Sequence, residues 1–71
     1  NLDPSWRVLT RRERQVIKMI AEGLKTREIA EVLSLSPKTV EKHRTNMMNK
    51  LDLHSVSAVT LYAIQSGLIN E

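Results

Sequence analysis

The polar side chains best able to do chemistry in this 71-residue sequence lie in one segment, from residue 36 to residue 50. Within it Glu41, Lys42 and Thr45 follow the spacing i, i+1, i+4, so on a helix they share one face. Lysine can donate to guanine O6 and N7, glutamate can accept from cytosine N4, and the threonine methyl can meet the thymine methyl. The spacing is compatible with reading base edges; the alternative is a solvated helix face.

A second kind of chemistry, binding of phosphate, is suggested at two predicted helix starts. Lys38 and Thr39 follow Ser36-Pro37, where free N–H groups and the positive end of the helix dipole favour anions. Lys25, Thr26 and Arg27 stand at an earlier start of the same kind. We assign these five residues to phosphate contacts, which fix register without reading sequence. For Thr26 and Thr39, helix capping is the alternative, and both roles can coexist.

The distribution of charge agrees with a polyanionic partner. The net charge is +3, and residues 36–50 alone carry a net +3, against +2 for residues 1–35 and −2 for residues 51–71. A basic segment within one helix is typical of proteins that bind nucleic acid. Charge by itself is explained equally well by a solvated basic helix face.

The elements that must position these residues are helices, and no strand pattern is present. Thr10 with Glu13 forms a capping box, Thr26 and Ser55 can cap later helices, and Ser36-Pro37 starts another. These signals predict helices at about residues 11–22, 27–33, 37–51 and 55–66. Residues 1–9 are interpreted as a linker or N-terminal arm, and residues 10–71 as one domain.

Apolar residues at helical spacing predict the core of this all-α, four-helix bundle. The expected core positions are Val16, Ile17, Ile20, Ala21, Leu24, Ile29, Ala30, Leu33, Val40, Met47, Met48 and Leu51, with Leu68 and Ile69 folding back onto them.

The spacing of the second and third predicted helices indicates a helix-turn-helix unit. A seven-residue helix, a three-residue turn at residues 34–36 and a longer helix beginning with Pro37 make up this arrangement. In such units the first helix crosses the DNA backbone and the second enters the major groove. Residues 37–51 are therefore the predicted recognition helix, roughly 22 Å long.

The sequence also resembles a known family over about residues 9–69. The matching features, in order, are Leu9-Thr10 with Glu13, Gly23, Glu28-Ile29-Ala30, Leu33, Ser36, Lys38-Thr39-Val40, His43 and Gly67-Leu68-Ile69. Together they are similar to the LuxR/FixJ/NarL type of four-helix DNA-binding domain, and the stretch KTVEKHR is most like its response-regulator members.

The resemblance implies a function and roles for particular residues. It implies a bacterial transcription regulator that binds double-stranded DNA as a homodimer paired through the last helix, controlled by an N-terminal receiver domain and acting with RNA polymerase. It implies that Glu41, Lys42 and Thr45 read base edges. It suggests a phosphate contact for His43, although a buried structural histidine is an equal alternative. Rim positions that can reach phosphate are Arg44, Asn46, Asn49 and Lys50.

The predicted last helix is apolar on more than one side, which is unusual for a surface helix of a small monomer. The surplus is consistent with a dimer surface, for which we name Val56, Val59, Thr60 and Ala63. The pattern does not separate this surface from the core face. A small interface would give a monomer or weak dimer that pairs on DNA.

Other functions have little support in the sequence. No nucleophile, base and acid arrangement or glycine-rich phosphate loop suggests an enzyme, and no cofactor or metal site is expected from two histidines and no cysteine. No apolar run is long enough to span a membrane, so we expect a cytoplasmic protein. The main alternative is a helical protein–protein interaction module, which the basic start of the third helix disfavours.

Overall fold

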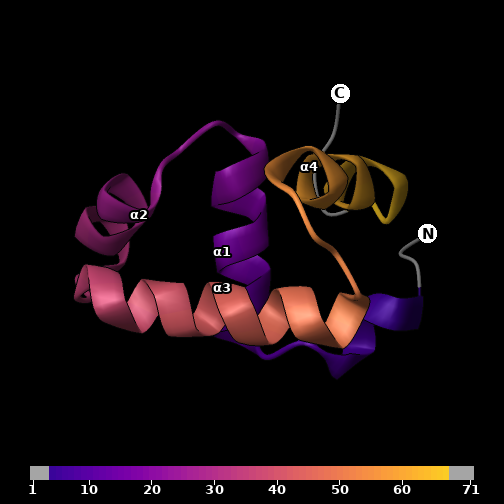
Figure 1. Ribbon diagram of the computed structural model, residues 1–71, viewed down its shortest axis with the longest axis horizontal. Coiled ribbons are helices and arrows are strands. Elements are labelled where there is room, and N and C mark those ends of the chain that lie inside the picture. Colours follow the sequence, from indigo (N-terminus) through magenta and orange to yellow (C-terminus); the bar gives the residue numbers. More distant parts are fainter. Residues whose placement is uncertain (1–3, 68–71) are drawn as a thin grey trace.

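The computed structural model describes residues 4–67, which form an all-α fold (Figure 1). A short 3-10 helix, η1 (Pro4–Val8), precedes α1 (Arg11–Ala21), α2 (Thr26–Leu33), α3 (Pro37–Leu51) and α4 (Val56–Gln65). In Figure 1, α3 lies along the longest axis, α1 crosses it, α2 sits at the N-terminal end of α3, and α4 lies on the other side of α1. The predicted fold class is confirmed.

Three of the four predicted helix starts are confirmed by their capping hydrogen bonds. Thr10 Oγ1 accepts from the Glu13 N–H at 3.1 Å, and the Thr10 N–H donates to Glu13 Oε1 at 2.9 Å, which completes the capping box. Ser36 Oγ accepts from the Thr39 N–H at 3.1 Å, with Pro37 as the first residue of α3. Ser55 Oγ accepts from the Ala58 N–H at 3.1 Å. These caps set where α1, α3 and α4 begin.

The expected cap of α2 at Thr26 was wrong, because α2 begins one residue earlier than predicted. Lys25 has the extended backbone of an N-cap, and its N–H donates to Glu28 Oε1 at 2.8 Å. Thr26 is the first residue of the helix. Its hydroxyl is therefore not used in capping and makes contacts with α3 instead.

Residues in left-handed conformation end the helices. Gly23, after α1, has φ +96°, as the sequence predicts for a helix terminator. Ser34, after α2, has φ 56° and a cap N–H that donates within the last turn. Leu35, the next residue, donates from its N–H to the Ala30 carbonyl at 2.9 Å and packs against the core. Ser34 therefore takes the conformation that glycine takes in many such turns.

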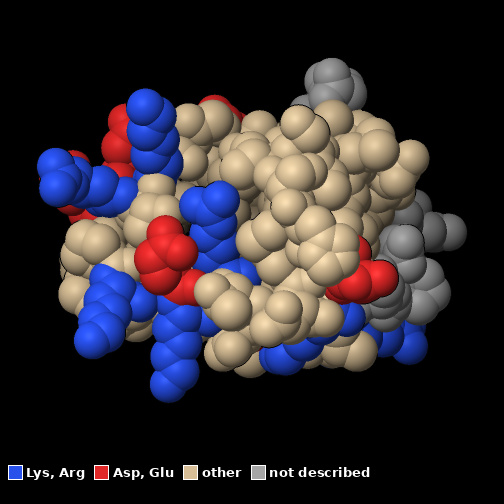
Figure 2. All heavy atoms as spheres, viewed as in Figure 1, with Lys and Arg blue, Asp and Glu red and all other residues tan. Residues whose placement is uncertain are grey.

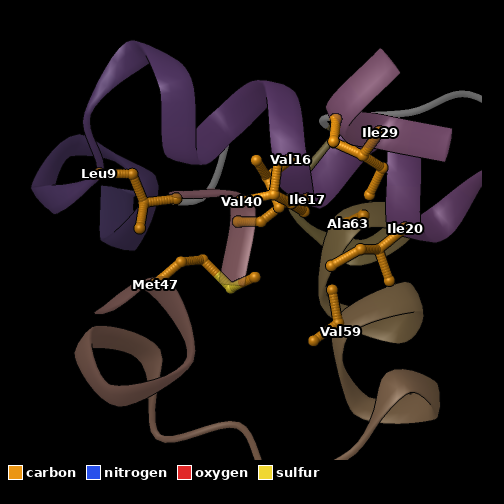
Figure 3. Packing of buried hydrophobic residues seen from close by; sticks show 10 residues of the cluster. Leu9, Val16, Ile17, Ile20, Ile29, Val40, Met47, Val59 and Ala63 are labelled. Carbon is orange, nitrogen blue, oxygen red and sulfur yellow. The ribbon is translucent and has the colours of Figure 1, made fainter. Parts of the chain in front are cut away.

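The hydrophobic core forms where α1 meets the other helices, since α1 contacts α2, α3 and α4. Figure 3 shows Val16 and Ile17 of α1 against Val40 of α3. Predicted core residues that are fully buried are Val16, Ile17, Ile20, Ile29, Ala30, Val40 and Met47, and those that pack against them partly exposed are Ala21, Leu24, Leu33, Met48 and Leu51. Leu68 and Ile69 lie outside the described residues.

Two residues named for the dimer surface belong to this core. Val59 is 1% exposed and Ala63 is 0% exposed, and both lie on the side of α4 that faces Ile20 of α1 (Figure 3). Their assignment to an interface was wrong, because neither can reach a partner without opening the core. On α4, Leu61 is 54% exposed and Val56 is also exposed, so the surplus apolar surface lies there.

Part of the segment predicted as a linker or N-terminal arm packs against the helices. Leu9 is buried, Trp6 packs against the core, and the Arg14 guanidinium lies 4.1 Å from the centroid of the Trp6 ring. Residues 1–3 lie outside the described part of the chain. The sequence gives no helical period for this segment, because its few apolar residues are not regularly spaced, and the burial of Leu9 depends on how the helices pack.

Candidate nucleic-acid interface

The outward side of α3 carries the predicted base-contacting residues on one surface. Val40 and Met47, both fully buried, fix the rotation of α3 about its axis. A shallow hollow of about 530 Å³ on the opposite side is lined by Ser36, Lys38, Thr39, Glu41, Lys42, Thr45 and Asn46. The structure thus brings together all three predicted base-contacting residues, two predicted phosphate contacts and Asn46, which the sequence placed only at the rim. We refer to this surface as the α3 face.

A second hollow lies at the start of α2. Its volume is about 520 Å³, and the residues that line it are Ile20, Gly23, Leu24, Lys25, Thr26, Arg27, Arg44 and Val56. Four predicted phosphate contacts, three of them cationic, therefore surround one N-terminal helix end, where backbone N–H groups point outward. We refer to this hollow as the α2 pocket.

On the face seen in Figure 2 the cationic side chains are distributed unevenly. In Figure 2, Lys and Arg gather over the end of the molecule where Figure 1 has α2 and the first half of α3. The surface over α4 in the same view is almost without charge. One end of this face is therefore suited to a polyanion, and the part over α4 is not.

A hydrogen-bond network joins the α3 face to the α2 pocket. The Thr26 hydroxyl donates to Glu41 Oε2 at 2.8 Å, and the Arg44 guanidinium donates to Thr26 Oγ1 at 3.2 Å. Residues of α2 and of α3 thereby hold one another in place across the helix-turn-helix. The sequence carries no local signal for this network, because its members lie fifteen and eighteen residues apart.

Thr39 takes part in capping and still lies on the α3 face. Its N–H donates to Ser36 Oγ, and the two hydroxyl oxygens are 2.9 Å apart. The side chain remains partly exposed in the hollow. The geometry is compatible with both roles that the sequence suggested.

Lys50 makes an internal ion pair, unlike the other residues assigned to phosphate. Its ammonium lies 2.8 Å from Glu13 Oε1 and donates to the Val8 carbonyl at 3.2 Å. Lys50 is also about 18 Å along the helix from Lys38, at 1.5 Å per residue. The structure therefore gives Lys50 a structural role, linking α3 to α1 and to the end of η1.

Glu13 is a buried carboxylate with one partner, Lys50, that the sequence did not reveal. Burial acts to raise its pKa, but hydrogen bonds from the Lys50 ammonium and the Thr10 N–H, with the positive charges of Lys50 and His43, lower the pKa of Glu13 below its ordinary value. The capping box predicted the place of Glu13, but its ion pair joins residues 37 positions apart.

His43 is half-buried, and it lies on the inward side of α3 because it stands three residues after buried Val40 and four before buried Met47. His43 and Lys50 are seven residues apart, about two helical turns, and so share this side of α3. Neither residue lines the α3 face.

Residues 4–67 contain neither a cluster of metal-ligating side chains nor a membrane-spanning helix. No group of three or more His, Asp or Glu side chains there could hold a metal ion. None of the helices in this part of the chain has both the length and the apolar character needed to cross a membrane.

Comparison with known proteins identifies a family for this architecture. The family model described as bacterial regulatory proteins, luxR family, matches residues 7–63. The crystal structure of full-length FixJ from B. japonicum superposes with a TM-score of 0.80 at 35% sequence identity, over 93% of this chain and 32% of the FixJ chain.

Curated relatives carry names of the same kind. The uncharacterized response regulatory protein YgeK of Escherichia coli (strain K12) is 47% identical over 60 residues, which are 84% of this chain and 41% of YgeK. The response regulator UvrY of the same strain is 47% identical over 62 residues, or 87% of this chain and 28% of UvrY. The oxygen regulatory protein NreC of Staphylococcus carnosus is 43% identical over 68 residues, or 96% of this chain and 31% of NreC. The chain thus spans less than half the length of these relatives.

Proposed function

The chain belongs to the luxR family of bacterial regulatory proteins, and from this premise we propose that it binds double-stranded DNA sequence-specifically, with α3 in the major groove. The observation that carries the proposal is the α3 face, where Glu41, Lys42 and Thr45 share one exposed surface beside the cationic α2 pocket. A helix about 10–12 Å wide fits the major groove, which is about 12 Å wide.

The two surfaces take different parts in this proposal. Side chains of the α3 face contact base edges and carry the sequence preference, with Lys42 donating to guanine and Glu41 accepting from an amino group. Lys25 and Arg27 in the α2 pocket, with Lys38 at the start of α3, contact phosphates and fix the register. We also propose a phosphate contact for His43. This residue lies on the side of α3 that faces α1 and not on the α3 face.

The experiment compares two lysine variants that lose the same charge. We expect Lys42→Ala to relax base preference at one or two positions and to cost about 1–3 kcal/mol on a specific site. Lys18→Ala, on the exposed outer side of α1, is the control and leaves base preference unchanged. Affinities are measured on a duplex selected from a random pool, and on random DNA. If Lys42→Ala lowers affinity equally for the selected duplex and for random DNA, Lys42 contacts phosphate and does not read a base.

Salt dependence distinguishes DNA binding from a protein-interaction module. Neutralising several phosphates releases counterions, so the logarithm of the binding constant should fall steeply with the logarithm of salt concentration. Chemical-shift changes on adding the duplex are expected along the α3 face and at residues 25–27. Binding without salt dependence, or shifts that leave the α3 face unchanged, would overturn the proposal.

We also propose that two copies pair through α4 on DNA. Leu61 and Val56 leave apolar surface exposed on α4, and Thr60 and Ile64 are partly exposed beside them. We expect so few exposed apolar side chains to give at most a weak dimer, so that pairing depends on two half-sites about 10 base pairs apart.

The names of the relatives support a regulatory context for this binding. UvrY is a response regulator and YgeK a response regulatory protein, and more than half of each lies outside the matched part. We propose that a receiver domain controls DNA binding by this chain and that the bound dimer acts on RNA polymerase.

A further inference from the structure

We propose that Thr26 is a positioning residue that holds Glu41 for base discrimination, and that its hydroxyl is not a phosphate contact. The inference rests on the proposed function, because it assigns a role to a side chain at the same DNA-binding surface. It starts from the contact between the two helices of the helix-turn-helix, where Thr26 Oγ1 donates to Glu41 Oε2 at 2.8 Å. The same oxygen accepts from Arg44 at 3.2 Å.

The hydroxyl group of Thr26 has one proton to donate, and Glu41 already receives it. A phosphate oxygen only accepts hydrogen bonds, so the Thr26 hydroxyl cannot serve a phosphate and Glu41 together. The Arg44 guanidinium occupies one of the two lone pairs of the same oxygen. In this arrangement the phosphates nearest the α2 pocket are left to Lys25 and Arg27.

The bond to Thr26 restricts a side chain that would otherwise move freely. Glu41 is exposed on the α3 face, and in the groove its carboxylate meets the negative field of two phosphate backbones. With Oε2 held against α2, Oε1 remains to accept from the amino group of cytosine or adenine. Because Thr26 holds the Glu41 carboxylate before DNA binds, less conformational entropy is lost when the carboxylate contacts the base. Thr26 thereby preorganises Glu41.

Arg44 adds an electrostatic part to the same arrangement. The shared Thr26 oxygen keeps the Arg44 guanidinium two hydrogen bonds away from the Glu41 carboxylate. A positive charge at this place offsets repulsion between Glu41 and the phosphates. Loss of the Thr26 hydroxyl therefore releases both charged side chains of α3 from their contact with α2.

The test measures base preference for the 71-residue chain and variants at Thr26 and Glu41. Relative affinities for the four base pairs at each position of a selected duplex are compared among wild type, Thr26→Val, Thr26→Ser, Glu41→Ala and the double variant Thr26→Val/Glu41→Ala. Thr26→Val should lower discrimination about fivefold at the one base pair that Glu41→Ala also affects, as loss of a solvent-exposed hydrogen bond predicts. Thr26→Ser should retain the preference, because serine keeps the hydroxyl.

The double variant separates positioning from a direct contact. If Thr26 acts through Glu41, adding Thr26→Val to Glu41→Ala changes nothing further. An equal loss of affinity on all sequences, present also without Glu41, would show a phosphate contact and overturn the inference. Unchanged preference in Thr26→Val would overturn it as well.

Two controls keep the outcomes distinct. Thermal melting of each variant checks the fold, and Thr26→Ala, which also lacks the hydroxyl, replaces Thr26→Val if valine unfolds α2. If the wild-type chain binds DNA without any sequence preference, the proposed function itself is overturned. Wild-type preference that survives loss of the Thr26 hydroxyl overturns only the inference about Thr26.

Discussion

The ion pair between Glu13 and Lys50 should contribute to stability in a pH-dependent way, and Glu13→Gln tests it. The Glu13 side chain is 3% exposed and accepts at Oε1 from the Thr10 N–H at 2.9 Å and from the Lys50 ammonium at 2.8 Å. Glutamine has the same shape and keeps an oxygen for the Thr10 N–H, so the capping box survives. The substitution therefore removes the negative charge and little else.

The size of the effect follows from the exposure of the two partners. A hydrogen bond to a charged group contributes about 1.5–3 kcal/mol and a neutral one about 0.5–1.5 kcal/mol. Lys50 is 37% exposed, so its ammonium can turn to water when the carboxylate is gone. We expect Glu13→Gln to lower the free energy of unfolding by about 1–2 kcal/mol at pH 7. In a domain of this size that corresponds to a fall in Tm of roughly 5–12 °C.

The pH dependence gives the stricter test. Because the pKa of Glu13 is lowered in the folded state, the unfolded chain binds its proton more readily. The stabilisation is complete above the unfolded pKa of about 4.3 and is lost as pH falls through the lower folded pKa. The stability difference between wild type and Glu13→Gln should therefore shrink between pH 5 and pH 3.

Urea unfolding at pH 7, 5, 4 and 3 measures this difference. Glu22→Gln makes the same chemical change on an exposed carboxylate at the C-terminal cap of α1 and serves as the control. Its stability should be equal to or slightly above that of wild type, because a negative charge at a helix C-terminus is unfavourable. A difference for Glu13→Gln that is the same at pH 7 and pH 3 would refute the ion-pair explanation.

Three further predictions concern the core, the turn and the surface of α4. Val40→Asp should unfold the domain at room temperature, because it places an unpaired carboxylate in the core. As a control, Val32→Asp changes a side chain that is 60% exposed and should alter Tm little. Equal melting curves for the two variants would mean that α3 is rotated from its described position. At Ser34, where φ is 56°, glycine should give a chain more stable than alanine does by about 1 kcal/mol, measured by urea unfolding, and a more stable alanine variant would contradict the left-handed turn. Leu61→Gln should weaken cooperative binding to a duplex with two half-sites and leave binding to one half-site unchanged. The control, Val32→Gln, should leave both kinds of binding unchanged. Unchanged cooperativity in Leu61→Gln would exclude Leu61 from the dimer surface.

The sequence alone determined where α1, α3 and α4 begin and how the recognition helix is rotated. Thr10, Ser36 and Ser55 each cap a helix through a group three residues away, so the signal and its effect lie within one turn. Val40 and Met47, seven residues apart, set which side of α3 is buried, and hence which side carries Lys42. Local hydrogen bonding and periodicity act through neighbouring residues, and such neighbours can be read from the chain.

The tertiary structure decided what each polar or apolar residue contacts across helices. The bonds of Thr26 to Glu41 and Arg44, and the ion pair of Lys50 with Glu13, depend on the packing of helices that are distant in sequence. In the sequence, nothing distinguishes Lys50 from the other basic residues of α3. Only the packing of α1 places the Glu13 carboxylate beside it.

The division of α4 between core and surface was also decided by packing. Its apolar residues occur on several sides, so periodicity did not separate Val59 and Ala63, which are buried, from Leu61, which is exposed. A helix with one apolar stripe indicates its inward side by itself. A helix that is apolar on several sides acquires an inward side only from the neighbour that covers it, and here that neighbour is α1.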